Sequence, residues 1–156
     1  MIQQAIDIAG SKFVYTACLV DASGNTYSAA TSAAPAPYLA GATAVMASSG
    51  NVANANAVAT MSGVTAKTNY LSGFEATGAG ATAGSIVSVT VGGLLGGTAT
   101  YTYVVPAGAL IATTPLVVSF VPPLQASATN TAIVVTVPAL GVGNTNSTVV
   151  AHGYVV

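Results

Sequence analysis

The chain has 156 residues, of which 53% are hydrophobic and only 3% are charged, whereas an ordinary soluble domain is about 25% charged. Its net charge is −1 and it has two basic residues, which excludes a basic patch for nucleic acid or an anionic membrane surface. No apolar run reaches the roughly 18 residues that cross a bilayer. We therefore expect a subunit that packs against neighbours, because charge does little to keep its copies apart.

The N-terminal part, up to about residue 50, contains one clearly patterned stretch. From Ser11 to Val20 the chain alternates as a strand does. One face carries Phe13, Tyr15, Ala17 and Leu19, and the other carries Lys12, Val14, Thr16 and Cys18. Since both faces bear apolar side chains, we expect the strand to dock either onto its own C-terminal domain or onto another subunit. We favour docking between subunits, which makes Phe13, Tyr15 and Leu19 candidate interface residues.

A hairpin and a linker are predicted after this strand. Residues 21–25 carry a turn signal, and residues 26–28 are expected to return as the partner strand. Residues 29–37 are small and include two prolines, a composition typical of an extended arm. The N-terminus lacks the basic start and apolar run of a secretory signal, so we expect synthesis in a cytoplasm.

After about residue 50, short β patterns alternate with turn signals. The candidate strands are Ala53–Met61, Asn69–Thr77, Ser85–Val91, Ala99–Val105, Leu116–Val121, Ala132–Val137 and Ser147–Val155. Such a series predicts an all-β fold, an antiparallel β-sandwich or jelly roll over residues 51–156, preceded by the N-terminal hairpin and arm. Residues 40–59 are rich in Ala, but Gly41 and Gly50 argue against a helix there.

The predicted strands have a weak polar face. In the strand from Leu116 to Val121 the two faces are Leu, Val and Phe against Val, Ser and Val. Edge strands therefore lack the Lys and Glu that usually prevent pairing with other chains. We expect Pro122-Pro123 to end its strand and so to limit such pairing.

One long stretch carries a family resemblance. Its motifs are Ala66-Lys-Thr-Asn-Tyr-Leu-Ser-Gly-Phe-Glu75, Thr77-Gly-Ala-Gly80, Gly93-Leu-Leu-Gly-Gly-Thr98, Thr100-Tyr-Thr-Tyr103, Pro138-Ala-Leu-Gly141, Gly143-Asn-Thr-Asn146 and Ala151-His-Gly153. With these motifs, residues 54–154 resemble a group of small proteins encoded in tailed-phage and prophage genomes. The resemblance implies a structural protein of the virion, in the head, neck or tail, and it assigns no catalytic residue.

Residues suited to catalysis or metal binding are few. His152 is the only histidine, Cys18 the only cysteine, and the acids are Asp7, Asp21 and Glu75. A nucleophile–base pair or a metal site needs several such groups at suitable spacing, which this sequence does not show. We interpret His152 and Cys18 as packing residues and Glu75 as an exposed or paired carboxylate, and we expect no enzyme activity, metal or cofactor.

The segment Gly92-Gly-Leu-Leu-Gly-Gly97 is glycine-rich, but it lacks the Lys-Ser/Thr ending of a phosphate-binding loop. It is typical of a hairpin turn. Leu94 and Leu95 would then be exposed at its tip, and exposed apolar residues often mark contacts. We therefore add both leucines to the candidate interface residues.

These observations favour a capsid decoration or head-stabilising protein, located in the virion. Its expected partners are its own copies, in a homo-oligomer for which a trimer is the arrangement we favour, and the major capsid protein or other virion proteins. Nucleic acid and membrane are not expected partners. The alternative is a tail or fibre module that adheres to the host surface, for which Tyr101 and Tyr103 are the candidate sugar-stacking residues.

Overall fold

The computed structural model describes residues 41–141, 143–144 and 146–156, and in the first forty residues the backbone of four short strands. The chain divides into two units, residues 1–37 and residues 38–156. No helix occurs in the part of the chain that is described, and these residues therefore contain no helix that could span a membrane.

In the N-terminal unit, four two-residue strands form two antiparallel pairs. Strand β1 (Ala5–Ile6) pairs with β2 (Val14–Tyr15), and β3 (Leu19–Val20) pairs with β4 (Thr26–Tyr27). The second pair agrees with the hairpin predicted around residues 21–25. Of the strand predicted over residues 11–20, the described parts are β2, which pairs with β1, and β3, which pairs with β4.

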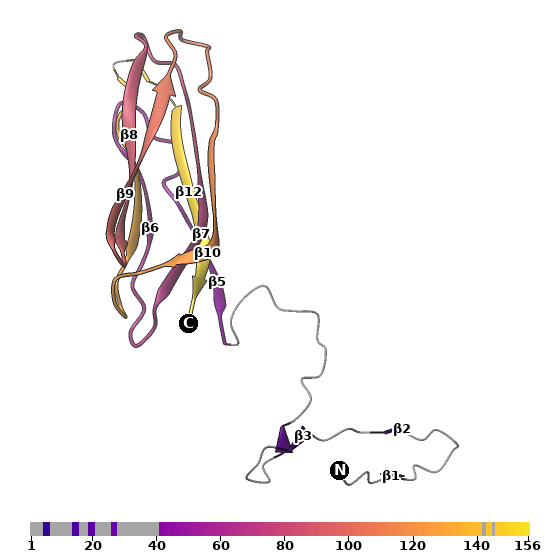
Figure 1. The fold of residues 1–156 in the computed structure, drawn as a ribbon. Coiled ribbons are helices and arrows are strands. Elements are labelled where there is room, and N and C mark those ends of the chain that lie inside the picture. The colour runs from indigo at the N-terminus through magenta and orange to yellow at the C-terminus, as the bar shows by residue number, and fades with distance from the viewer. Residues whose placement is uncertain are drawn as a thin grey trace. The chain divides into compact units, whose positions relative to one another are not determined.

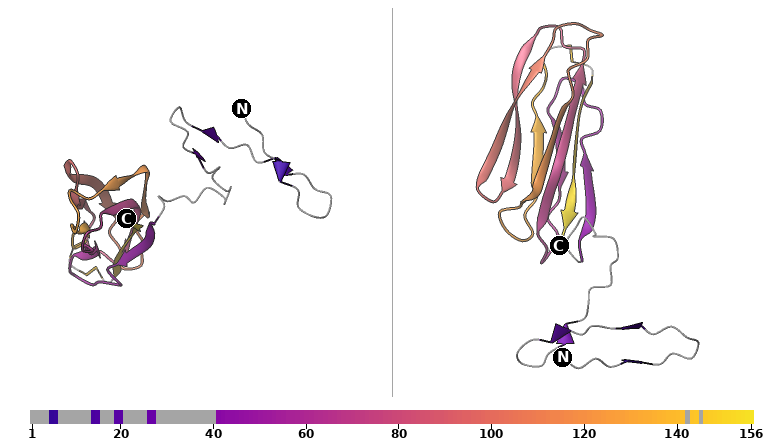
Figure 2. Two further views of the ribbon diagram at one scale, coloured as in Figure 1. Left: turned by 90° about the horizontal axis from the view of Figure 1, so that it is seen from below. Right: turned by 45° about the vertical axis from the view of Figure 1, so that its right-hand side comes forward.

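The second unit is a β-sandwich of two four-stranded antiparallel sheets (Figures 1 and 2). One sheet has the order β10-β7-β12-β5 and the other β6-β11-β8-β9. The strands are β5 (Thr43–Ser48), β6 (Ala57–Met61), β7 (Asn69–Ala79), β8 (Ser85–Leu94), β9 (Gly97–Val105), β10 (Leu116–Gln125), β11 (Ile133–Val137) and β12 (Asn146–Val155). The predicted all-β sandwich is thus confirmed.

All seven strands predicted after residue 50 are present, and the sandwich has one more. Strand β5 pairs with β12, with Met46 opposite His152 and Val45 opposite Gly153. The β domain therefore includes residues that the sequence analysis assigned to the N-terminal part. Strand β5 has an Ala-rich sequence without strong alternation, and its pairing with β12 defines it as a strand.

The core lies between the two sheets and follows from the alternation of the strands. In β6 and β11, every second residue is buried, beginning with Ala57 and Ile133. Phe74 of β7 is fully buried, with its ring 5.3 Å from the Tyr101 ring in an edge-on contact and 6.4 Å from the Phe120 ring. Burying one side chain of this size stabilises the fold by about 1.5–3 kcal/mol.

Strand β10 differs from its prediction at the two prolines. It pairs with β7 up to Ser119, opposite Gly73, and resumes at Leu124, opposite Leu71, so that residues 120–123 face the single residue Ser72. The prolines lie within this bulge and do not end the strand. Because β10 is an edge strand, its proline nitrogens need no ladder partner, which is why prolines are tolerated there.

Beyond the bulge, β10 turns toward the other sheet (Figure 1). The backbone N–H of Leu95 donates to the carbonyl of Gln125 at 2.9 Å, and the N–H of Ser127 donates to the carbonyl of Gly93 at the same distance. The segment after the prolines therefore joins the two sheets at the end of the sandwich that holds the β8–β9 turn.

Candidate functional site

The titratable side chains of the β domain do not form a catalytic group. His152 is half-buried on the outer face of the β10-β7-β12-β5 sheet, where it covers Gly73: a Cβ added at Gly73 would lie 3.0 Å from His152 Nε2. Glu75 is exposed on β7, opposite Val150. Over the described ranges, no three His, Cys, Asp or Glu side chains come together as a possible metal site.

The buried hydroxyl of Tyr103 serves the fold. It bonds to the Thr113 hydroxyl and lies 3.3 Å from the carbonyl of Ala76, while Thr113 Oγ1 donates to the carbonyl of Gly78 at 3.0 Å. These bonds fasten the loop before β10 to β7. Burial raises the pKa of Tyr103, and its hydrogen bond to Thr113 partly opposes this.

The two candidate sugar-stacking tyrosines do not form an exposed platform. Tyr103 is 3% exposed, and Tyr101 packs edge-on against Phe74 in the core. A sugar stacks on a ring face that is open to solvent, and neither tyrosine has a fully exposed ring face.

The structure separates the two leucines of the β8–β9 turn. Leu94 is 7% exposed and belongs to the core, whereas Leu95 is 65% exposed at the tip. The expectation that Leu94 is exposed is therefore wrong. The register shifts between Val91 and Leu94, where Gly93 has a φ of +81°, and this bulge turns Leu94 inward although simple alternation would turn it outward.

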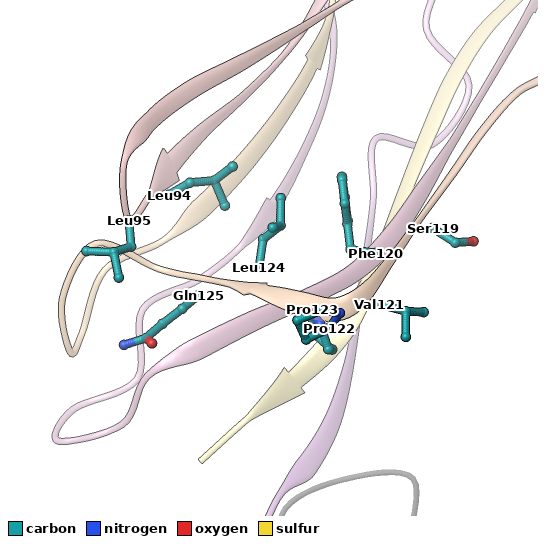
Figure 3. Close-up of a pocket in the computed structure, with 9 residues that line it drawn as sticks. All are labelled: Leu94, Leu95, Ser119, Phe120, Val121, Pro122, Pro123, Leu124 and Gln125. Atoms are coloured by element: carbon teal, nitrogen blue, oxygen red, sulfur yellow. The ribbon is translucent and has the colours of Figure 1, made fainter.

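Beside this turn lies an apolar groove of about 470 Å³ (Figure 3). Its lining comes from the turn and from β10: Leu94, Leu95, Ser119, Phe120, Val121, Pro122, Pro123, Leu124 and Gln125. Figure 3 shows Phe120 and Leu124 rising from the same side of β10, whereas Val121 points away. Val121 is 95% exposed, and no lining side chain carries a charge.

A second groove, of about 410 Å³, lies where β9 ends and β10 begins. It is lined by Tyr103, Val104, Pro106, Ala112, Thr114, Pro115 and Leu116. Between the two grooves, half-buried side chains of both strands reach the core from the sandwich's edge: Ala99, Tyr101, Leu116, Val118 and Phe120. We call this strip, with its two grooves, the β9–β10 seam.

The seam exists because the edge strands of the two sheets pack against each other on one side of the sandwich and not in the same way on the other. Strand β5 packs against β6, while β9 and β10, the other two edge strands, do not pack against each other in this way. Apolar side chains on the inner faces of β9 and β10 are therefore left partly open to solvent. Sequence reasoning missed the seam because strand pairing, and not the pattern within any strand, decides which strands are edges.

The outer faces of the sheets are also apolar and nearly uncharged. Large exposed apolar side chains on the described strands are Met46, Val58, Ile86, Val104, Val117 and Val121, and those in the loops are Val64, Leu95, Leu110 and Ile111. Lys67 and Glu75 are the charged residues of the sequence from residue 41 onward. Of the N-terminal candidates, Tyr15 lies in β2 and Leu19 in β3, while Phe13 lies outside the described residues.

Comparison of the chain with protein-family models, curated proteins and solved structures gives no match. The surface of the β domain is therefore the basis on which a function is proposed.

Proposed function

We propose that this chain is a structural protein of a phage virion, a capsid decoration or head-stabilising protein that binds the shell through apolar and neutral polar surfaces. The observation that carries the proposal is the combination of many exposed apolar side chains with two charged residues after residue 41. A surface of this kind is suited to being covered.

The mechanism is adhesive. Burying a charge in an interface costs free energy, and a surface without charges avoids that cost. A stable contact buries roughly 800 Å² on each partner, and apolar area contributes about 25 cal/mol per Å² before the costs of association. Many copies on a symmetric shell, each with a modest contact, would together oppose the shell's expansion.

The proposal is tested by adding the purified chain to phage heads that lack it. Binding should saturate at a fixed ratio to the major capsid protein and should change little between about 0.05 and 0.5 M salt, because few charges are available for screening. Decorated heads should release their DNA at a higher temperature than bare heads. Binding to host cells or glycans, with none to heads, would overturn the proposal and favour the adhesion module.

A matched pair of variants shows which sheet faces the shell. Val117 is 62% exposed on the outer face of β10, and Ile86 is 73% exposed on the outer face of β8, in the other sheet and outside both grooves. Val117→Asp and Ile86→Asp place the same charge on the two faces. We expect one of them to weaken binding at least about tenfold, since an unpaired charge in an interface costs more than 1.4 kcal/mol. Unchanged binding by both would show that neither sheet face makes the contact.

A further inference from the structure

The outer edge of β9 is a free pairing surface. Strand β9 is hydrogen-bonded to β8 on one side, and on its other side no backbone partner is found within the described part of the chain. Its sequence, Gly-Thr-Ala-Thr-Tyr-Thr-Tyr-Val-Val, has no charge and no proline. Charged residues and prolines normally protect the edge strands of natural sheets from pairing with other chains. The nine-residue edge of β9 has neither, so it can act as a template for another strand.

The apolar side chains of the seam beside this edge are also only partly covered by the rest of the domain. A strand added along β9 would lay every second side chain over the half-buried Ala99 and Tyr101 and toward Val118 and Phe120 of β10. Backbone bonds to β9 would supply affinity, and the two grooves would receive the larger side chains. The occupant must therefore be extended, uncharged over most of its length and alternately apolar.

The chain itself contains a segment with these properties, residues 11–20. Its ten residues are one more than the nine of β9, and its only charge is Lys12. One face carries Phe13, Tyr15, Ala17 and Leu19. The parts of this segment that the structure describes, β2 and β3, each make a two-residue pairing with another short strand. Such short two-stranded pairings are marginal in water, so a longer pairing along β9 can replace them.

The point where the chain enters the β domain also fits. Thr43, at the start of β5, pairs with Val155, which pairs with Asn69, and the carbonyl of Asn69 accepts the N–H of Ala126 next to the larger groove. The chain thus enters at the end of the sandwich that holds this groove. Residues 21–42 precede it and, when extended, could span up to about 70 Å.

We propose that the β9–β10 seam binds residues 11–20 of a second copy of this chain as an added strand. This inference deepens the proposed function, because it names the contact through which copies would join each other. We place the segment on a second copy because a chain with so few charges has little to oppose self-association. Reciprocal exchange between two copies would close a dimer, whereas one-way exchange from copy to copy would build larger rings or chains of subunits.

The single cysteine of the chain allows a direct test in solution. When Phe13, Tyr15 and Leu19 face the seam, Cys18 faces outward with the exposed Thr98, Thr100 and Thr102 of β9. One copy keeps Cys18; the other, of different mass, carries Cys18→Ser together with a cysteine at one of these threonines. A disulfide between the two cysteines can then form only between copies, and mild oxidation followed by a non-reducing gel measures it.

Thr60 supplies the matched control. It is exposed on β6, at the opposite edge of the same sheet, and Thr60→Cys introduces the same residue away from the seam. At least one β9 position should give about tenfold more mixed dimer than Thr60→Cys, because binding raises the local concentration of the two thiols. An excess of a peptide of residues 11–20 with Cys18→Ser should reduce that yield.

Equal yields at β9 and at Thr60, or no mixed dimer at any position, would overturn the inference. So would an internal disulfide in one chain carrying both Cys18 and Thr100→Cys while mixed dimers are absent, because the segment would then occupy its own seam. The experiment contains no phage particles. Mixed dimers without head binding would refute the virion role alone, and head binding without mixed dimers would refute strand exchange alone.

Discussion

At the scale of single residues, Gly153 shows how closely the strands of the β10-β7-β12-β5 sheet approach. A Cβ added there would lie 1.9 Å from the carbonyl oxygen of Tyr70 and 3.0 Å from Met61 Cε. A carbonyl in a sheet cannot move aside as a flexible side chain can. We expect Gly153→Ala to lower the free energy of unfolding by about 1–3 kcal/mol.

The matched control for Gly153→Ala is Gly84→Ala, where the nearest atom to an added Cβ is an ordinary 3.6 Å away. Gly84→Ala should change the stability by less than about 0.5 kcal/mol. Chemical denaturation of both variants measures the difference. Equal stabilities would contradict the close approach of β12 and β7.

The buried hydroxyl of Tyr103 should make the free energy of unfolding depend on pH in the alkaline range. Burial raises the pKa of Tyr103 above its usual value near 10, because the neutral phenol is preferred in the folded chain. The stability that this preference contributes is fully present below about pH 10 and is lost as the pH rises through the higher folded pKa. Tyr103→Phe should cost about 0.5–1.5 kcal/mol at pH 7, through the lost hydrogen bonds.

Tyr103→Phe should also lose stability less steeply than the wild type above about pH 10, because it has no hydroxyl to ionise at this site. Denaturation series at several alkaline pH values compare the two slopes. Parallel slopes would refute the raised pKa.

At the scale of elements, the β8–β9 turn separates a core role from a surface role in adjacent leucines. Leu94→Ala removes a core side chain and should destabilise the domain by about 2–5 kcal/mol, whereas Leu95→Ala should change stability by less than about 0.5 kcal/mol. Thermal denaturation compares them. If Leu95→Ala were the more destabilising of the two, the placement of the bulge at Gly93 would be wrong.

The strands after residue 50 could be predicted because each carries its own alternation and turn signals. Leu94 could not be placed, because the glycine bulge before it reverses the alternation, and nothing in the pattern Gly-Gly-Leu-Leu fixes the bulge. Strand β5 was missed because its Ala-rich sequence gains its structure from β12. The seam depends on which strands form the edges, a property of the whole sheet order that no single strand encodes.

At the scale of the whole molecule, the two units allow the arm and the domain to be tested separately. The buried core of the β domain is built from residues between Ala57 and Val155. Deleting residues 1–37 should therefore leave the sandwich folded, with a β-type circular dichroism spectrum. The truncated chain should bind fewer copies per head than the full chain. Wild-type occupancy would show that the arm does not attach the protein, and loss of folding would show that the arm belongs to the core.

The central claim is that this chain coats the phage head, and cryo-electron microscopy of the native particle tests it most directly. The account predicts density for the eight-stranded sandwich at repeated, symmetry-related positions on the outer surface of the shell, in contact with the major capsid protein. Density for the sandwich only on a tail or fibre, or its absence from the particle, would contradict the account.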